Sequence, residues 1–149
     1  MKIFLPLQRV DAEQRMVWGY GSTEALCSDG LIVRNDAIRE ALPDYMKFGN
    51  IREMHQPSAV GVARSAEVDD KGVYLGAHIV DEEAWKKVEA GVYKGFSIGA
   101  QVTRREPPNI VAGVKILEFS LCDRPVNPES VFDIYRAEGE DAAVAQVRA

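Results

Sequence analysis

The sequence contains few residues of the kinds that form covalent cross-links or hold metal ions. Its 149 residues include two cysteines and two histidines. Cys27 and Cys122 lie far apart and form no Cys-x-x-Cys pair, so we expect two reduced, partly buried thiols such as those of cytosolic proteins. A zinc site would have to combine them with His55 and His78, and the spacing gives this little support. We therefore predict no metal and no other cofactor.

Long apolar segments and clusters of basic residues are also missing. Residues 1–10 are too short for a signal peptide, are broken by Pro6 and lack a small-residue cleavage site. The apolar stretch at residues 109–122 is interrupted by Lys115 and Glu118, so we expect no membrane-spanning segment. The net charge is -5 and no run of lysine and arginine occurs, so neither a membrane nor a nucleic acid is an expected partner.

The composition is that of an ordinary globular protein, with 46% hydrophobic and 28% charged residues. This chain length suits one domain, which we place at residues 1–136. Residues 137–149 contain no aromatic side chain and, apart from valine, no large aliphatic one. We expect these last residues to form a mobile or weakly helical tail.

The first of two expected helices lies between residue 35 and Gly49. Asn35 or Asp36 can cap its start, and Gly49 can end it. Pro43 falls inside the helical pattern, so we expect the helix to break or kink there.

The second helix has the clearer pattern and lies within residues 81–95, with Asp81 as its cap and Gly91 well placed to end it. The remaining periodic segments alternate as strands do, and residues 69–72 form a turn between two of them. This pattern predicts a mainly β or α+β fold, a partly closed antiparallel β-barrel of about six or seven strands with two or more flanking helices. The expected strands are residues 16–26, 31–34, 50–68, 73–80, 96–105 and 110–123.

One candidate nucleophile lies in the segment YKGFSIGAQV, residues 93–102. Ser97 stands between Gly95 and Gly99, so the letters fit Gly-x-Ser-x-Gly. The nucleophile elbow of an α/β-hydrolase needs a strand–turn–helix context, whereas the context here is helix–loop–strand. A serine also needs a neighbouring base before it can attack a substrate. Taken alone, Ser97 is as well explained as a small residue in a strand.

The two histidines are the available bases. His55 lies in REMHQPSAVG, near the polar end of an extended segment, and His78 lies in LGAHIVD among apolar neighbours. Each of them alone is better explained as a structural histidine of a sheet.

Glu118 is the third candidate. It stands between Leu117 and Phe119 in an otherwise apolar strand and shares a face with Ser120. A buried carboxylate is costly unless it finds a partner. Two interpretations have equal weight on the pattern alone: a glutamate of an edge strand that faces water, or a carboxylate that accepts a hydrogen bond from an imidazole and orients it.

Three segments in order, NIREMHQPSAVG, EAGVYKGFSIGAQV and ILEFSLCDRPVNPES, together resemble one known family. They are similar to the histidine, serine and final segments of the prohead maturation proteases of tailed bacteriophages, which are related in fold to the herpesvirus capsid proteases. The segment VWGYGSTEALCSDGLIV also resembles the opening strands of that family, so the resemblance covers most of the chain.

The resemblance implies a role for each candidate. Ser97 would be the nucleophile, His55 the general base and Glu118 the third member of a triad, with Asp123 as the fallback. The herpesvirus enzymes use a second histidine in the third role, and this chain has none after His78.

The donors of an oxyanion hole are not evident from the sequence. The backbone N–H groups of Ile98 and Gly99 are candidates, and Arg104 or Arg105 could assist as cations. An exposed strand end is the simpler explanation of the two arginines.

The resemblance further implies a serine endopeptidase that cleaves the scaffold protein, the major capsid protein and itself inside immature proheads in the bacterial cytoplasm. A homo-oligomer is compatible with it. Two other hypotheses remain: a non-catalytic phage structural or scaffold-associated module of the same fold, and a hydrolase that pairs His78 with Ser97.

Overall fold

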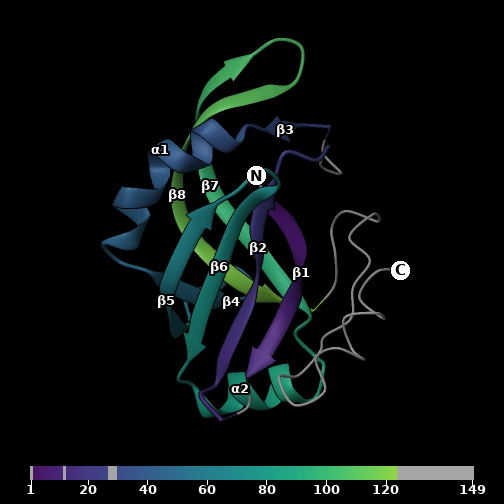
Figure 1. Ribbon diagram of the computed structural model, residues 1–149, viewed down its shortest axis with the longest axis vertical. Coiled ribbons are helices and arrows are strands. Elements are labelled where there is room, and N and C mark those ends of the chain that lie inside the picture. The colour runs from purple at the N-terminus through teal and green to yellow at the C-terminus, as the bar shows by residue number, and fades with distance from the viewer. Residues whose placement is uncertain (1, 12, 27–29, 124–149) are drawn as a thin grey trace.

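The computed structural model describes residues 2–11, 13–26 and 30–123. Within them the chain forms eight strands and two helices (Figure 1). In chain order these are β1 (Lys2–Asp11), β2 (Met16–Thr23), β3 (Ile32–Val33), α1 (Asn35–Met46), β4 (Asn50–Glu53), β5 (Ala59–Val68), β6 (Gly72–Ile79), α2 (Glu82–Glu89), β7 (Gly95–Glu106) and β8 (Ile110–Cys122).

The strands curl into a barrel. Their hydrogen-bonded order is β3-β8-β4-β5-β6-β2-β1-β7, and β7 also pairs with β8. Because this last pairing joins the two ends, seven strands form a ring, and β3 adds to the free part of β8. Neighbouring strands are antiparallel except that β3 and β4 both run parallel to β8. The mainly β fold expected from the sequence is confirmed.

The N-terminal strand β1 was not among the strands expected from the sequence. It pairs with β7 from Lys2 to Pro6 and with β2 from Leu7 to Asp11. Pro6 therefore lies where β1 passes from one neighbour to the other. A proline has no N–H to give to a sheet, and such a change of partner is a position where its loss is tolerated.

The hydrophobic core lies inside the barrel. Phe96 and Ile98 of β7 and Phe119 of β8 are fully buried there. Gly21 makes room for this packing, because a Cβ atom at that position would lie 2.3 Å from the Phe119 ring. The register of β2 against β6 shifts between Tyr20 and Ser22, so the strand is irregular at Gly21. Each fully buried phenylalanine contributes roughly 1.5–3 kcal/mol to the free energy of unfolding.

Helix α1 follows β3 and packs against β8 (Figure 1). The expected cap at Asn35 or Asp36 is wrong, because the N-cap residue is Arg34, which makes no side-chain cap hydrogen bond. The carboxylate of Glu24, distant in sequence, instead accepts a hydrogen bond from the Asn35 N–H at 2.6 Å. A local sequence pattern does not reveal a cap of this kind.

Pro43 does not end α1, which continues to Met46. Tyr45, in the turn after the proline, is buried and packs edge-on against Phe119 at 5.0 Å between ring centroids. This tertiary contact holds the last turn of α1 against the barrel, and Gly49 follows it in the left-handed conformation with φ 59°.

Helix α2 matches its expected bounds and leads into β7 (Figure 1). The Asp81 carboxylate accepts a hydrogen bond from the Ala84 N–H at 3.0 Å, as a capping residue does. Gly91, with φ 77°, follows the last turn in the left-handed conformation that glycine favours. Trp85 and Val88 are buried against the barrel, so α2 fixes the direction from which the chain enters β7.

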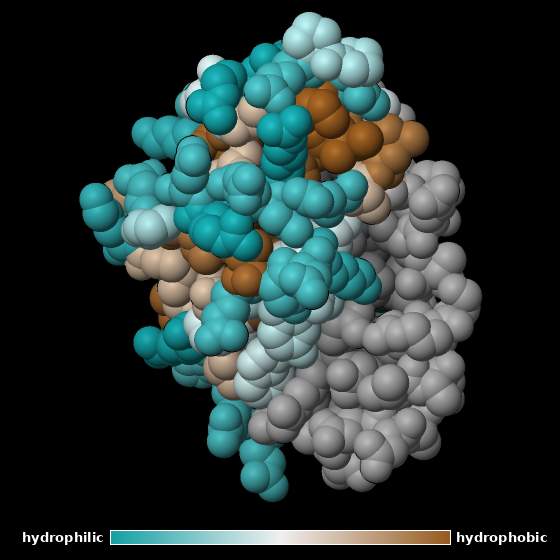
Figure 2. Space-filling view, turned by 45° about the horizontal axis from the view of Figure 1, so that its top comes forward, coloured by the Kyte–Doolittle hydropathy of each residue, from teal (hydrophilic) through white to brown (hydrophobic). Residues whose placement is uncertain are grey.

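Figure 2 shows a largely hydrophilic face with separate hydrophobic areas. None of the helices formed by residues 2–11, 13–26 and 30–123 has the length and apolar character needed to cross a bilayer. Cys122 is a buried thiol, whereas Cys27 and the expected tail at 137–149 lie outside the described residues.

Candidate active site

His55 lies in a tight turn that follows β4. The strand runs parallel to β8, and its pairing is extended by a 2.9 Å hydrogen bond from the Met54 N–H to the Leu121 carbonyl. Met54 and His55 then both adopt left-handed backbone conformations, with φ 53° and 58°. The turn closes when the Gln56 N–H donates to the Glu53 carbonyl at 2.9 Å. This abrupt change of direction brings the imidazole over the outer face of β7 and β8.

Ser97 and Glu118 lie on that outer face, on neighbouring strands. Ser97 stands opposite Ser120 in the β7–β8 ladder, and Gly99 stands opposite Glu118. Phe96, Ile98 and Phe119 point into the core. Because side chains alternate along a strand, their chain neighbours Ser97 and Glu118 point out of the barrel wall.

The three predicted site residues form a continuous hydrogen-bonded chain. His55 Nε2 lies 2.8 Å from Ser97 Oγ, and His55 Nδ1 lies 2.6 Å from Glu118 Oε2. A carboxylate only accepts hydrogen bonds, so the neutral ring carries its proton on Nδ1 and presents Nε2 as the acceptor for the serine hydroxyl. This is the arrangement in which an imidazole can take a proton from a hydroxyl.

The carboxylate is shielded from water. Glu118 is 4% exposed, and β8 has β7 on one side and β4 on the other. The interpretation of Glu118 as a water-facing residue of an edge strand is therefore wrong. Ser97 is 1% exposed and the His55 side chain 14%, so the imidazole is the most accessible of the three groups.

The Glu118 carboxylate occupies the space above Gly99. A Cβ atom at position 99 would lie 1.9 Å from Glu118 Oε2 and 2.8 Å from its Cδ. A side chain at this position and the carboxylate in its present place exclude each other. Gly99 is therefore required by the site and not by the backbone conformation of β7.

Replacing Gly99 with alanine is expected to leave the barrel folded but to displace the carboxylate from His55. The Glu118 side chain can turn away, so the new methyl group costs the site more than it costs the fold. A displacement of about 1 Å lowers the rate of an enzymatic reaction by about 100-fold. The measurements are the rate at which a serine-directed fluorophosphonate labels the protein and the thermal unfolding midpoint, with exposed Gln101→Ala in the same strand as control. An unchanged rate for Gly99→Ala would contradict this reading.

Ser120 also belongs to this cluster. Its hydroxyl accepts a hydrogen bond from the His55 backbone N–H at 3.1 Å and donates one to Glu118 Oε1. Ser120 was not among the site residues expected from the sequence, although its place two residues after Glu118 on the same face of a strand was a usable signal.

A second contact ties the histidine turn to the serine strand. The Tyr93 hydroxyl, just before β7, donates to Glu53 Oε1 at 2.5 Å, and the Ser58 hydroxyl donates to Glu53 Oε2 at 3.1 Å. Burial and the bond to Glu53 raise the pKa of Tyr93, so this phenol stays a neutral donor. The Glu53 carboxylate thereby joins the two ends of the loop that carries His55, at Glu53 and Ser58, and ties this loop to Tyr93.

The other candidates from the sequence lie elsewhere. His78 is on β6, paired with Met16 of β2 and Val62 of β5, three strands from β7 around the barrel. Asp123 is exposed after the end of β8, and the His55 ring hydrogen bonds to Glu118 instead. Of the two acids considered for the third position, the structure brings Glu118 to the imidazole.

The suggested oxyanion donors are poorly placed. Ile98 and Gly99 lie in the part of β7 that pairs with both β1 and β8, where backbone N–H groups are used by the ladders. The Arg104 guanidinium donates to the Ala112 carbonyl at 2.9 Å. Arg104 and Arg105 are seven and eight residues beyond Ser97, roughly 25 Å along an extended strand. These arginines belong to the projecting end of the β7–β8 hairpin (Figure 1).

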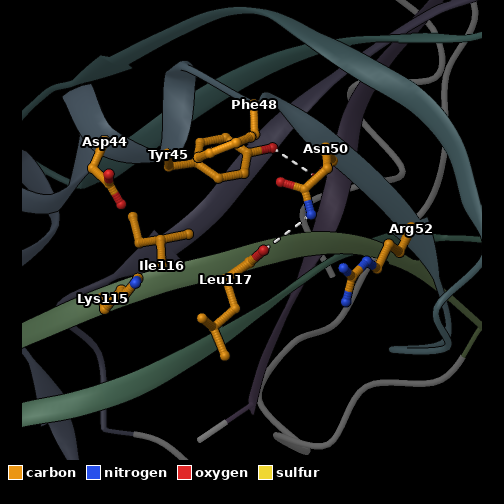
Figure 3. Close-up of a pocket in the computed structure, with 8 residues that line it drawn as sticks. All are labelled: Asp44, Tyr45, Phe48, Asn50, Arg52, Lys115, Ile116 and Leu117. Atoms are coloured by element: carbon orange, nitrogen blue, oxygen red, sulfur yellow. Dashed lines mark hydrogen bonds between the residues drawn. The ribbon is translucent and has the colours of Figure 1, made fainter.

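A pocket of about 340 Å³ lies between the end of α1, the start of β4 and the part of β8 that precedes Glu118 (Figure 3). The Tyr45 hydroxyl donates to the Asn50 carbonyl at 2.9 Å, and Asn50 Nδ2 donates to the Leu117 carbonyl at 3.0 Å. These bonds fix the start of β4 against β8. The lining residues are Asp44, Tyr45, Phe48, Asn50, Arg52, Lys115, Ile116 and Leu117.

Among the residues that the structure describes, no group of three or more histidine, cysteine, aspartate and glutamate side chains is arranged to hold a metal ion.

The fold and this cluster define a β-barrel protein with a serine, a histidine and a glutamate in the order used by serine hydrolases. A particular solved structure shares the fold: the bacteriophage T4 capsid assembly protease, gp21. It has a TM-score of 0.61 and 14% sequence identity, covering 74% of this chain and 82% of that chain. The expected structural likeness to a phage capsid protease is thus confirmed for the fold. No model of a known protein family and no curated protein matches the sequence.

Proposed function

We propose that this protein is a serine endopeptidase of the prohead maturation type, with Ser97 as nucleophile, His55 as general base and Glu118 as the group that orients His55. The observation that carries the proposal is the position of the His55 ring between Ser97 Oγ at 2.8 Å and Glu118 Oε2 at 2.6 Å. With one ring nitrogen at the hydroxyl and the other at the carboxylate, the imidazole can take the serine proton while the acid stabilises the resulting charge.

The reaction would be acyl transfer to the serine. Ser97 Oγ attacks the peptide carbonyl carbon while its proton passes to His55 Nε2, and the new C–O bond gives a tetrahedral intermediate. The intermediate collapses as the C–N bond breaks, and the proton on Nε2 goes to the leaving amine. Water then attacks the acyl carbon and gives a proton to His55 Nε2. The ester C–O bond breaks, the proton passes from Nε2 to Ser97 Oγ, and the carboxylic acid product leaves. Glu118 stabilises the imidazolium that forms in each half of the reaction.

The structural likeness to a capsid assembly protease supports a capsid-related substrate. The protein would cleave the scaffold protein and the major capsid protein, and itself, inside the immature prohead in the host cytoplasm. The imidazole is partly exposed beside the buried hydroxyl, so a substrate would approach from the outer face of the β7–β8 wall.

A non-catalytic structural module of the same fold is the competing hypothesis. A module kept only for its fold has no need for Gly99, whose missing side chain makes room for the Glu118 carboxylate. It also has no need to bury a carboxylate in a barrel wall, which is costly unless the charge has a function or a partner. Both features favour the enzyme.

The test is covalent labelling of the full chain with a fluorophosphonate, followed by mass analysis of the labelled peptide. In this reaction Ser97 Oγ forms a bond to phosphorus, fluoride leaves and His55 takes the hydroxyl proton. We expect one label, on Ser97. Co-expression with the neighbouring scaffold and capsid proteins, with mass analysis of the fragments, then tests the substrates. Absence of labelling together with absence of fragments would reject the proposal.

Replacing Glu118 with glutamine is expected to lower the rate of cleavage by about 10⁴-fold, less than the loss of the nucleophile or the base. An amide keeps the shape of the side chain but places an N–H₂ group where His55 Nδ1–H needs an acceptor. The rates of labelling and of fragment formation measure the effect. Glu67→Gln, which changes an exposed carboxylate in β5, is the matched control. A rate unaffected by Glu118→Gln would leave the site without its orienting acid.

A further inference from the structure

The Ser120 hydroxyl contacts two members of the site at once, and the proposed mechanism does not use it. Ser120 is fully buried on β8, directly opposite Ser97 in the ladder. Its Oγ accepts the His55 backbone N–H and donates its own proton to Glu118 Oε1. Its donor and one acceptor position are thus both used within the site.

The bond to Glu118 fixes which carboxylate oxygen faces the imidazole. With Oε1 held by Ser120, Oε2 is directed at His55 Nδ1. Two oxygens held by two different donors define the plane of the carboxylate. Without the hydroxyl, Oε1 would be a buried acceptor without this donor, and the carboxylate would be free to turn toward another partner.

The hydrogen bond that the His55 N–H donates to Ser120 Oγ stabilises a strained backbone turn. A left-handed conformation in a residue other than glycine costs of order 1–3 kcal/mol, and two such residues follow each other at Met54 and His55. The His55 N–H finds its acceptor in the Ser120 side chain and not in a neighbouring strand. The hydroxyl therefore helps to hold the turn that brings the ring over Ser97.

We propose that Ser120 is a positioning residue of this site, which sets the orientation of Glu118 and of the His55 turn through a single hydroxyl. The inference rests on the proposed function of Ser97, His55 and Glu118. Ser120 touches no reacting atom and acts through its two partners.

The first test is Ser120→Ala in the full chain, measured by the second-order rate constant for fluorophosphonate labelling of Ser97. We expect a fall of about 100-fold, the loss that a displacement of about 1 Å can cause. With a peptide substrate the loss should lie in kcat and leave KM unchanged, because Ser120 is fully buried. Ser22→Ala is the matched control, since Ser22 is also a fully buried strand serine and its Oγ has no hydrogen-bond partner among the described residues. Its rate should not change.

The second test separates positioning from a general loss of packing. In a Glu118→Gln background the carboxylate that Ser120 orients is already gone, so adding Ser120→Ala should lower the rate by much less than it does alone. A purely structural role would give the same factor in both backgrounds. Equal factors, or labelling of Ser120→Ala at the parental rate, would overturn the proposal.

A variant with similar volume covers the case in which Ser120→Ala does not fold. Ser120→Cys keeps a side chain of similar shape, but its thiol is a weak donor. We expect it to label slowly at an unchanged unfolding midpoint, and labelling at the parental rate would count against Ser120. If the parental protein itself fails to label on Ser97, the proposed function fails. If it labels and the Ser120 variants label equally fast, only the positioning role fails.

Discussion

Replacing Ser97 with alanine is expected to abolish cleavage and fluorophosphonate labelling while the barrel stays folded. Loss of the nucleophile in a serine protease lowers kcat by about 10⁶-fold, which brings the rate below most assays. The fold should tolerate the change because Ser97 is buried and alanine fits the space of its side chain. Loss of the hydrogen bond to His55 Nε2 lowers the free energy of unfolding by about 1 kcal/mol. Mass analysis of scaffold fragments and of the labelled peptide measures the effect.

The control for this experiment is Ser22→Ala, which removes another buried strand hydroxyl outside the site. It should cleave and label as the parental protein does. Fragments produced by Ser97→Ala at the parental rate would mean that another residue is the nucleophile.

Removing the proposed base, His55, should lower the rate by a similar factor. His55→Ala is expected to lower kcat by about 10⁶-fold, because an unassisted serine hydroxyl is a poor nucleophile. Alanine is disfavoured at φ 58°, so His55→Asn is the better variant: asparagine adopts the left-handed conformation more readily and still lacks the base. Circular dichroism and the unfolding midpoint should then match those of the parental protein while labelling is lost.

His78→Ala is the matched control for the base and also tests the competing hydrolase hypothesis. His78 is a half-buried strand histidine three strands from β7, so its loss should leave the labelling rate of Ser97 unchanged. Loss of activity in His78→Ala with activity kept in His55→Asn would reverse the assignment of the base.

The structure brings together residues that the sequence keeps 21 to 63 positions apart. Glu118 lies 21 residues after Ser97, and His55 lies 63 residues before Glu118. The β7–β8 hairpin makes the shared face of Ser97 and Glu118 predictable, since alternation along each strand places both side chains on one face of the sheet. The approach of His55 to both of them depends on the parallel pairing of β4 with β8, which periodicity does not reveal.

Three further details of the site could not be predicted from the sequence. Alternation along the strand predicts that Ser120 shares a face with Glu118. It does not predict the two hydrogen bonds that the Ser120 hydroxyl makes. The requirement for Gly99 follows only from the register of β7 against β8, which sets it opposite Glu118. The left-handed turn at Met54 and His55 is held by tertiary contacts, so local propensity does not indicate it.

The sequence by itself determined the mainly β fold, the second helix with its Asp81 cap and the residue types available for chemistry, because hydrophobic alternation and capping act over a few neighbouring positions. Tertiary structure alone decided which histidine meets Ser97 and whether Glu118 is buried or faces water. Those outcomes depend on the order in which strands close the barrel and on their register, and both are set by packing between segments far apart in the chain.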